Sequence, residues 1–183
     1  MREIRECKYW LESMLGSEVP MFSYPYGYYD ESIVDAVRRA GFRGARTMRR
    51  FCITKPSNPY EMNITLQACP LSIAQRPPSL SRFCPFINYS LAPRLVGDYL
   101  DMRKGLKVSP YYLKDWKILA KWLFELSLRN GGVFHLWGHS WEIDERAMWE
   151  DLESILDYIS GRRTCSYVTN SEILALTSNK TFT

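Results

Sequence analysis

Residues 131–144 have the sequence GGVFHLWGHSWEID and hold both histidines of the 183-residue chain. The two glycines end an apolar helical pattern, and the β-rich residues 133–137 that follow them predict a strand. On a helix, His135 and His139 would share one face and could bind one zinc ion. On a strand they would be about 13 Å apart, because each residue advances about 3.3 Å. Zinc–nitrogen bonds of about 2.1 Å cannot bridge that distance, so the sequence argues against a metal site shared by the two histidines.

His139 lies at the expected carboxyl end of this strand. Catalytic groups gather at the carboxyl ends of strands in parallel α/β folds, which makes His139 a candidate catalytic residue. His135 lies in the middle of the strand, where a structural histidine is more common. Trp137 and Trp141 flank His139 and are interpreted either as core or as aromatic walls of a carbohydrate site. Glu142 is a candidate partner of His139 or a helix N-terminal acid.

The first 47 residues alternate between helical and extended patterns. The expected order is helix, strand, helix, strand, over residues 2–15, 19–24, 31–40 and 42–47. Gly16 and Gly41 are expected to end the two helices, and Asp30 to cap the second. This alternation favours an α/β fold with a parallel sheet.

The rest of the chain is also expected to alternate between strands and helices. Strands are expected over residues 62–69, 133–137 and 164–168. Helices are expected over 112–130 and 144–160, and a last short helix, capped by Asn170, should end near residue 176. The helix over 144–160 should direct inward its apolar residues Trp149, Leu152, Ile155, Leu156 and Ile159. Residues 48–112 contain a Pro-rich run, interpreted as a long excursion over one face with short helices around 92–103.

Composition predicts one globular domain over residues 1–183, with 46% hydrophobic and 24% charged residues. A net charge of +4 does not favour nucleic-acid binding. The densest cationic cluster comprises Arg38, Arg39, Arg43, Arg46, Arg49 and Arg50. It is interpreted as a solvated face or, alternatively, as an anion or glycan contact. The five cysteines are dispersed along the chain, and a charged segment directly follows Met1. Together with the absence of a long apolar run, these features predict a cytoplasmic protein without membrane contact.

Three blocks of sequence resemble the polysaccharide deacetylases of carbohydrate esterase family 4, the NodB-homology family. They are FSYPYGYYDESIVDAVRRAGFRGART at 22–47, HLWGHSWEI at 135–143 and VTNSEI at 168–173. The order of the blocks makes the resemblance specific. It implies the C-terminal portion of a distorted parallel (β/α) barrel, here with a long Pro-rich excursion.

The resemblance implies hydrolysis of N-acyl bonds, which are non-peptide C–N bonds, in a glycan or a small amide. A divalent metal such as zinc polarises the carbonyl group and activates water in such enzymes. The family's aspartate base and its metal ligands, an aspartate and two histidines, belong to two N-terminal motifs. Neither motif is present here, and no histidine precedes His135. The chain alone is therefore expected to bind no metal.

Two further elements carry over from the family. Tyr26 matches the residue whose backbone N–H holds the oxyanion, although Ser23 replaces the family's arginine and the turn alone also favours this sequence. His139 matches the general acid that protonates the leaving amine. Asp115, followed by Trp116, is a possible match to the pair that orients this histidine, although it also suits a helix start. The residues expected to contact substrate are Tyr24, Trp137 and Trp141.

Two hypotheses follow from the missing metal motifs. In the first, the chain is a fragment of a deacetylase-like enzyme, either truncated or completed by a separate N-terminal-half polypeptide. In the second, it is an inactive remnant that binds glycan or protein. A partial barrel leaves a strand edge unpaired, which predicts a partner chain or self-association. A nucleic-acid-binding module is the least favoured hypothesis.

Overall fold

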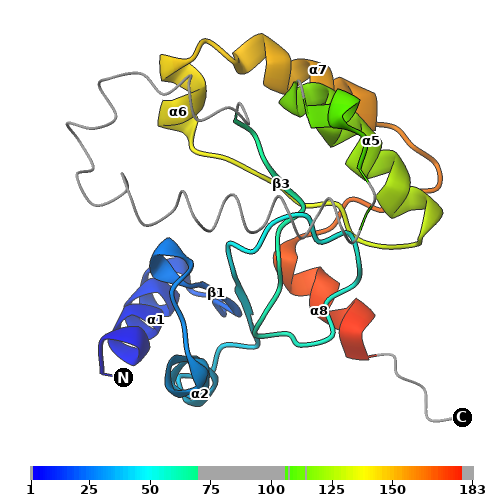
Figure 1. Ribbon diagram of the computed structural model, residues 1–183. Helices are drawn as coiled ribbons and strands as arrows, with labels where there is room; N and C mark the ends of the chain where they lie inside the picture. The colour runs from blue at the N-terminus through cyan, green and yellow to red at the C-terminus, as the bar shows by residue number, and fades with distance from the viewer. Residues whose placement is uncertain (1, 70–105, 107, 114, 179–183) are drawn as a thin grey trace, which may run out of the picture.

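The computed structural model describes residues 2–69, 106, 108–113 and 115–178 (Figure 1). The short helices expected around residues 92–103 lie outside the described residues. No described helix is long and apolar enough to cross a membrane.

The first part of the chain has the expected order of helix, strand, helix and strand. Its elements are α1 Arg2–Leu15, β1 Met21–Ser23, the 3-10 turn η1 Pro25–Gly27, α2 Glu31–Arg39 and β2 Gly44–Arg46. Gly16 and Gly41 follow the helices in the left-handed conformation, with φ of 64° and 88°. The Asp30 carboxylate caps α2 by accepting the Ile33 amide at 2.9 Å. The predictions for this part are confirmed to within a few residues.

Helix α1 does not bury a continuous apolar stripe. Lys8 is its buried residue, and its Nζ donates to the Val19 carbonyl oxygen at 2.7 Å and contacts Glu12 at 2.5 Å. Trp10 and Met14 are 59% and 70% exposed. The helix is therefore held to the residues just before β1 by a polar contact, and part of its apolar surface faces solvent.

The strands follow one another in parallel. β1 pairs with β2, and Arg46 at the end of β2 forms a parallel bridge with Met62. Further along the same segment, β3 Leu66–Gln67 pairs in parallel with β4 Leu136–Trp137. The segment from Met62 to Gln67 thus connects the two small sheets, and the expected parallel α/β layout is confirmed. The described strands do not close into a barrel.

The second part of the chain contains most of the described helices. They are η3 Pro110–Leu113, α5 Trp116–Arg129, α6 Ser140–Glu145, α7 Trp149–Ile159 and α8 Asn170–Ser178. The single helix expected over 144–160 is instead two helices, because Ala147 adopts a φ of 51° between them. The Met148 amide turns back to the Ile143 carbonyl oxygen at 2.9 Å, which starts α7 in a new direction.

The last expected strand is absent from the structure. Residues 164–168 are not paired in any sheet, and Tyr167 and Val168 are 58% and 44% exposed. The cap of α8 also differs, because Thr169 and Glu172 form a reciprocal capping box. Asn170 is thereby released from the expected capping role.

Two groups of buried residues form the core of the described chain. The smaller consists of Tyr24, Val37, Phe42 and Ala45, and the larger of Ile53, Leu66, Ala68, Val108, Trp116, Leu119, Ala120, Leu123 and Ile155. The predicted inward face of α7 is only partly correct. Ile155 is fully buried, whereas Trp149 and Leu156 are 50% and 48% exposed. Gly132 passes so close to the larger group that a Cβ atom would lie 1.8 Å from the Ile53 carbonyl oxygen.

Candidate functional site

His139 lies directly after β4, at the N-cap position of α6. Its φ and ψ of −101° and 127° are extended. Its carbonyl oxygen accepts the Glu142 and Ile143 amides, both at 3.1 Å. The backbone is therefore fixed at the carboxyl edge of a parallel sheet, the edge at which α/β proteins build their sites. Because β4 separates His135 from His139, the helical arrangement needed for a shared metal ion is absent.

The His139 ring lies between two tryptophans. The Trp137 ring meets it edge-on, with centroids 4.6 Å apart, and the Trp141 ring stacks on it at 5.1 Å. Trp141 is 41% exposed, so this side of the aromatic group is open to solvent. The three rings form a continuous apolar wall with one titratable group in it, a common composition for a ligand site.

A chain of polar side chains runs across the same edge of the sheet. Arg50 donates to Gln67 Oε1, and Gln67 Nε2 donates to Glu142 Oε2 at 3.1 Å. Glu142 Oε1 lies 3.6 Å from Arg146 Nε, and both side chains are only 12% exposed. The interactions link the loop after β2, the end of β3 and helix α6, which carries Trp141.

The sequence did not reveal most of this polar chain. Glu142 is a candidate partner in the sequence and Arg50 belongs to its cationic cluster, but no pattern in the sequence points to Gln67 or Arg146. Gln67 is the residue with a usable signal, because it is a polar residue at the end of an apolar strand and is 8% exposed. A buried amide needs hydrogen-bond partners on both of its polar atoms.

Tyr26 has an unusual backbone conformation in the turn after β1. Its φ of 55° is left-handed, which costs a non-glycine residue about 1–2 kcal/mol, and its side chain is 71% exposed. Its amide makes no hydrogen bond to any described residue. Strained backbone often occurs at functional sites, and a fixed free N–H is what an oxyanion donor requires. No hydrogen bond or ring contact among the described residues joins Tyr26 to His139.

Tyr24 lies in the core, where substrate does not reach it. The side chain is 2% exposed, stacks on Tyr29 at 4.6 Å and donates its hydroxyl to the Tyr60 carbonyl oxygen at 3.0 Å. Burial raises the pKa of this hydroxyl to about 12. The expected substrate contact is therefore replaced by a structural role.

Asp115 occupies the N-cap position of α5. Its carboxylate accepts the Lys117 amide at 2.8 Å, and the Lys117 Nζ lies 3.7 Å from it. The same Nζ contacts Asp151 at 2.6 Å, which ties α5 to α7. Within the described part of the chain no contact links Asp115 to His139. The structure thus supports the capping interpretation of this residue.

His135 is held in the sheet by its backbone. Its carbonyl oxygen accepts the Thr65 and Leu66 amides, and its own amide donates to Thr65 Oγ1 at 2.9 Å. The ring Nδ1 is buried and has no partner among the described residues. Burial, aided by the charge of Arg46, lowers the pKa of the imidazole to about 4, so the ring is neutral at physiological pH.

The described residues do not fit a catalytic metal. They contain no group of three or more His, Cys, Asp or Glu side chains close enough to hold one ion. Three protein ligands are the usual minimum for a catalytic zinc. No step of the chemistry proposed below is therefore assigned to a metal held by these residues.

A family model for polysaccharide deacetylases matches residues 1–45. The match covers α1, β1, η1, α2 and the start of β2, and confirms the resemblance to that family for this part of the chain. No curated protein and no solved structure matches the chain. The segment around His139 lies outside the matched residues.

Proposed function

We propose that this chain forms the general-acid side of a polysaccharide-deacetylase-like hydrolase that cleaves N-acyl bonds in a glycan or a small amide. The observation that carries the proposal is the position of His139 between Trp137 and Trp141 at the carboxyl edge of β4. The family match at residues 1–45 supplies the reaction class.

The residues have separate roles in the proposed reaction. Water adds to the acyl carbon, the Tyr26 amide holds the resulting oxyanion, and the carbon–nitrogen bond then breaks. Protonated His139 gives its proton to the leaving nitrogen, and an acid and a free amine are released. Trp137 and Trp141 contact the apolar face of the substrate. The polar chain through Gln67 keeps α6, and with it Trp141, in place.

Activation of water requires groups that this sequence lacks. We propose that a polypeptide with the family's two N-terminal motifs, bound to this chain, supplies the divalent metal and the aspartate base. The exposed apolar residues of α1, such as Trp10 and Met14, leave surface for such a partner or for a second copy. A chain that remains monomeric by light scattering, alone and with that polypeptide, would contradict this part of the proposal.

The decisive experiment is a fusion. The motif-bearing half of an active polysaccharide deacetylase is placed before Arg2, and acetate release from an N-acetylglucosamine oligomer is measured with added Zn²⁺ and with chelator. We expect chelator-sensitive release that His139→Ala lowers by about 10²–10⁴-fold. Arg39→Ala, at an exposed position on α2, is the matched control and should leave the rate unchanged. A folded, zinc-loaded fusion without acetate release contradicts the proposal.

The second candidate is a glycan-binding protein without catalysis, favoured by the half-open Trp141 face and the missing metal residues. Tryptophan fluorescence of the unfused chain, titrated with an N-acetylglucosamine trimer, measures binding directly. For this candidate we expect Trp141→Ala to abolish the signal and His139→Gln to preserve it. We also propose a cytoplasmic location, since Cys7, Cys52 and Cys165 are free thiols.

A further inference from the structure

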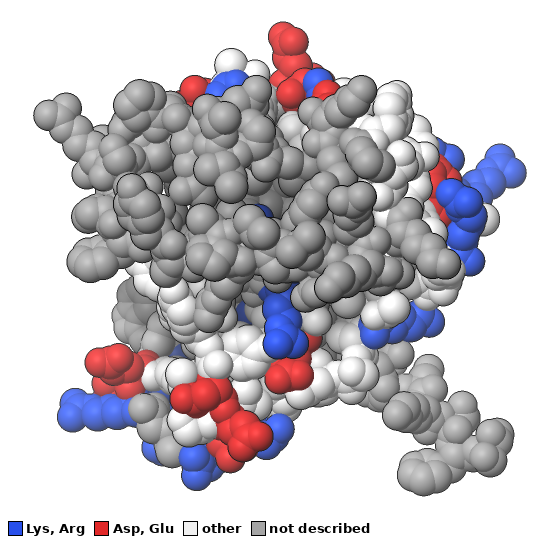
Figure 2. Space-filling model, viewed as in Figure 1, with Lys and Arg blue, Asp and Glu red and all other residues white. Residues whose placement is uncertain are grey.

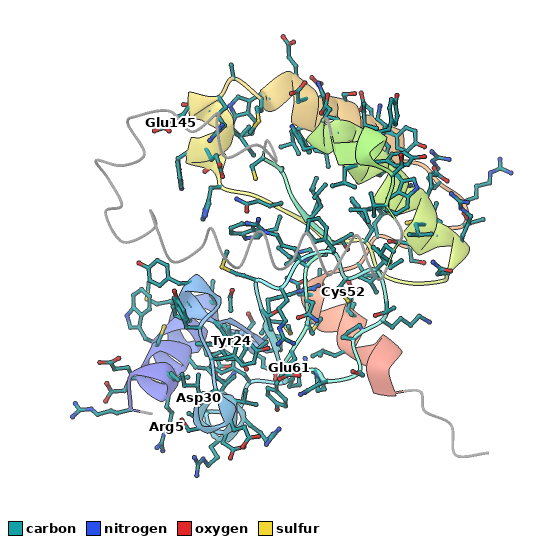
Figure 3. The ribbon with its side chains drawn as sticks, in the orientation of Figure 1. Arg5, Tyr24, Asp30, Cys52, Glu61 and Glu145 are labelled. Atoms are coloured by element: carbon teal, nitrogen blue, oxygen red, sulfur yellow. The ribbon has the colours of Figure 1, made fainter. Side chains whose placement is uncertain are left out.

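A cavity of about 230 Å³ lies away from His139, beside helix α8. It is enclosed by the segment from β2 to β3, the residues before β4 and α8, and Figure 3 shows Cys52 and Glu61 on loops close to that helix. Pockets for larger organic ligands usually exceed about 300 Å³, so the cavity suits a small ion.

A buried arginine lines this cavity. Arg46 is 7% exposed, and its Nε and Nη2 donate to Asn170 Oδ1 at 3.0 and 2.7 Å. Its Nη1 donates to the Asn63 carbonyl oxygen at 2.8 Å. Both partners are neutral, and these three bonds leave part of the guanidinium's five N–H groups for another acceptor.

Glu61, the carboxylate that lines the same cavity, forms no ion pair with Arg46. No ion pair among the described residues includes Arg46. Burial lowers the pKa of the guanidinium to about 10, which still leaves it charged at neutral pH. Buried charges in proteins are normally paired, since an isolated charge is costly to desolvate. An anion in the cavity would supply the missing partner.

The rim of the cavity adds further positive charge. Arg49 and Lys55 line it and are exposed, while Glu61 is its one acidic residue. The lining therefore carries three cations against one carboxylate. In the lower part of the face shown in Figure 2, by contrast, acidic and basic side chains lie next to one another. Arginine donors in a fork are suited to oxyanions with two acceptor oxygens.

We propose that this cavity binds a small oxyanion, a phosphate or carboxylate group, with Arg46 as the buried anchor and Arg49 and Lys55 as rim contacts. The site is independent of the proposed hydrolysis at His139. It uses the C-terminal part of the arginine cluster, for which the sequence left an anion contact open. An anion here also joins the loop that contains Cys52 to α8 through the Arg46–Asn170 contact.

Cys52 provides an internal reporter of occupancy, because this residue lines the cavity. The intact chain is treated with iodoacetamide, and labelling of each cysteine is followed by mass spectrometry with sodium phosphate, acetate or chloride at equal ionic strength. We expect phosphate, acetate or both to slow labelling of Cys52 several-fold and to leave exposed Cys7 unchanged. Protection by one anion alone assigns the ligand class. Equal rates in all three salts, or equal protection of Cys7, would overturn the proposal.

Rim variants test the binding itself by calorimetry without disturbing the buried anchor. Arg49→Gln combined with Lys55→Gln should weaken binding of the protecting anion by about 10-fold or more, because two charge-assisted contacts are lost. Arg39→Gln removes an exposed cation outside the cavity and should change the affinity less than about two-fold. Equal weakening by the rim and control variants would mean general surface attraction and would refute the site. Circular dichroism confirms that each variant is folded.

Discussion

The part of the chain from α1 to β2 and the part from α5 to α8 both place helices against parallel strands. They differ in whether their helices and strands are specified by local sequence signals or by pairing with distant residues. In the first part each boundary has a local signal, such as Gly16, Asp30 or Gly41. In the second, β4 exists because it pairs with β3, a segment 70 residues earlier. Figure 1 shows α1 and α2 at one end of the molecule, α5 and α7 at the other, and β3 between them. The locally specified part carries the family match, and the part that depends on distant pairing carries His139.

The two parts also differ in the size of their buried cores. The smaller group has four buried hydrophobic residues, all in the first part. The larger group has nine, of which five lie in α5 and α7 and four, Ile53, Leu66, Ala68 and Val108, precede α5. Stabilisation by burial grows with the apolar area removed from water, so the larger group should dominate the stability of the chain. Substitutions in the larger buried group are therefore the most direct test of whether it dominates the stability of the chain.

The largest effect is expected from Ile155→Ala on α7. Ile155 is fully buried, so its truncation should lower the free energy of unfolding by about 4 kcal/mol. Its neighbour Leu156 is 48% exposed, and Leu156→Ala should cost less than about 1 kcal/mol. Urea unfolding followed by tryptophan fluorescence measures both. Similar costs for the two variants would mean that α7 packs through the face expected from its periodicity and not through the face seen here.

The second prediction concerns His135, near which the two parts meet. Its pKa is about 4 in the folded chain and about 6.5 in the unfolded chain, because burial and the charge of Arg46 disfavour the imidazolium. Below pH 6.5 the unfolded chain binds a proton at His135, whereas the folded chain binds it only below about pH 4. Stability that is fully present above pH 6.5 is therefore lost between these values, by up to about 3 kcal/mol.

Matched histidine variants isolate this dependence. His135→Gln should flatten the fall in unfolding free energy between pH 6.5 and 4, whereas His139→Gln should leave the fall in place. Chemical denaturation at a series of pH values provides the measurement. A fall that persists in His135→Gln would show that other groups cause it, and that the junction between the two parts is not sensitive to this proton.

Much of the fold follows from the sequence where the signals are local. Helices that begin at Asp30 or end at Gly16 are found as expected, since a capping side chain or a left-handed glycine acts within one turn. The break at Ala147 was not expected, because alanine favours helix and the break depends on how α6 and α7 pack. The strand expected at 164–168 failed for the opposite reason. Its residues suit a strand, but no described strand is available to pair with them.

The candidate site also combines residues that local sequence predicts with contacts that only the fold creates. His139, Trp137 and Trp141 could be placed together because they are close in sequence and lie at a strand end. The chain through Arg50, Gln67 and Glu142 could not be expected, because it joins three elements that only the folded sheet brings together. Tyr24 seemed a site residue by its position in a motif, and its burial depends on packing against Tyr29 and Tyr60.

The smallest effect concerns Asp115, for which motif and structure give different roles. If it acts as the cap of α5, Asp115→Ala should lower the free energy of unfolding by about 1 kcal/mol, and Asp115→Asn should cost only a few tenths because asparagine also caps well. In both variants the ring signals of His139 in NMR spectra should be unchanged, since the carboxylate interacts with Lys117 and not with the imidazole. A shift of those signals in Asp115→Asn, with stability preserved, would instead make Asp115 a positioning residue for His139. The second part of the chain would then contain a functional pair that only the family motif, and not the packing, had revealed.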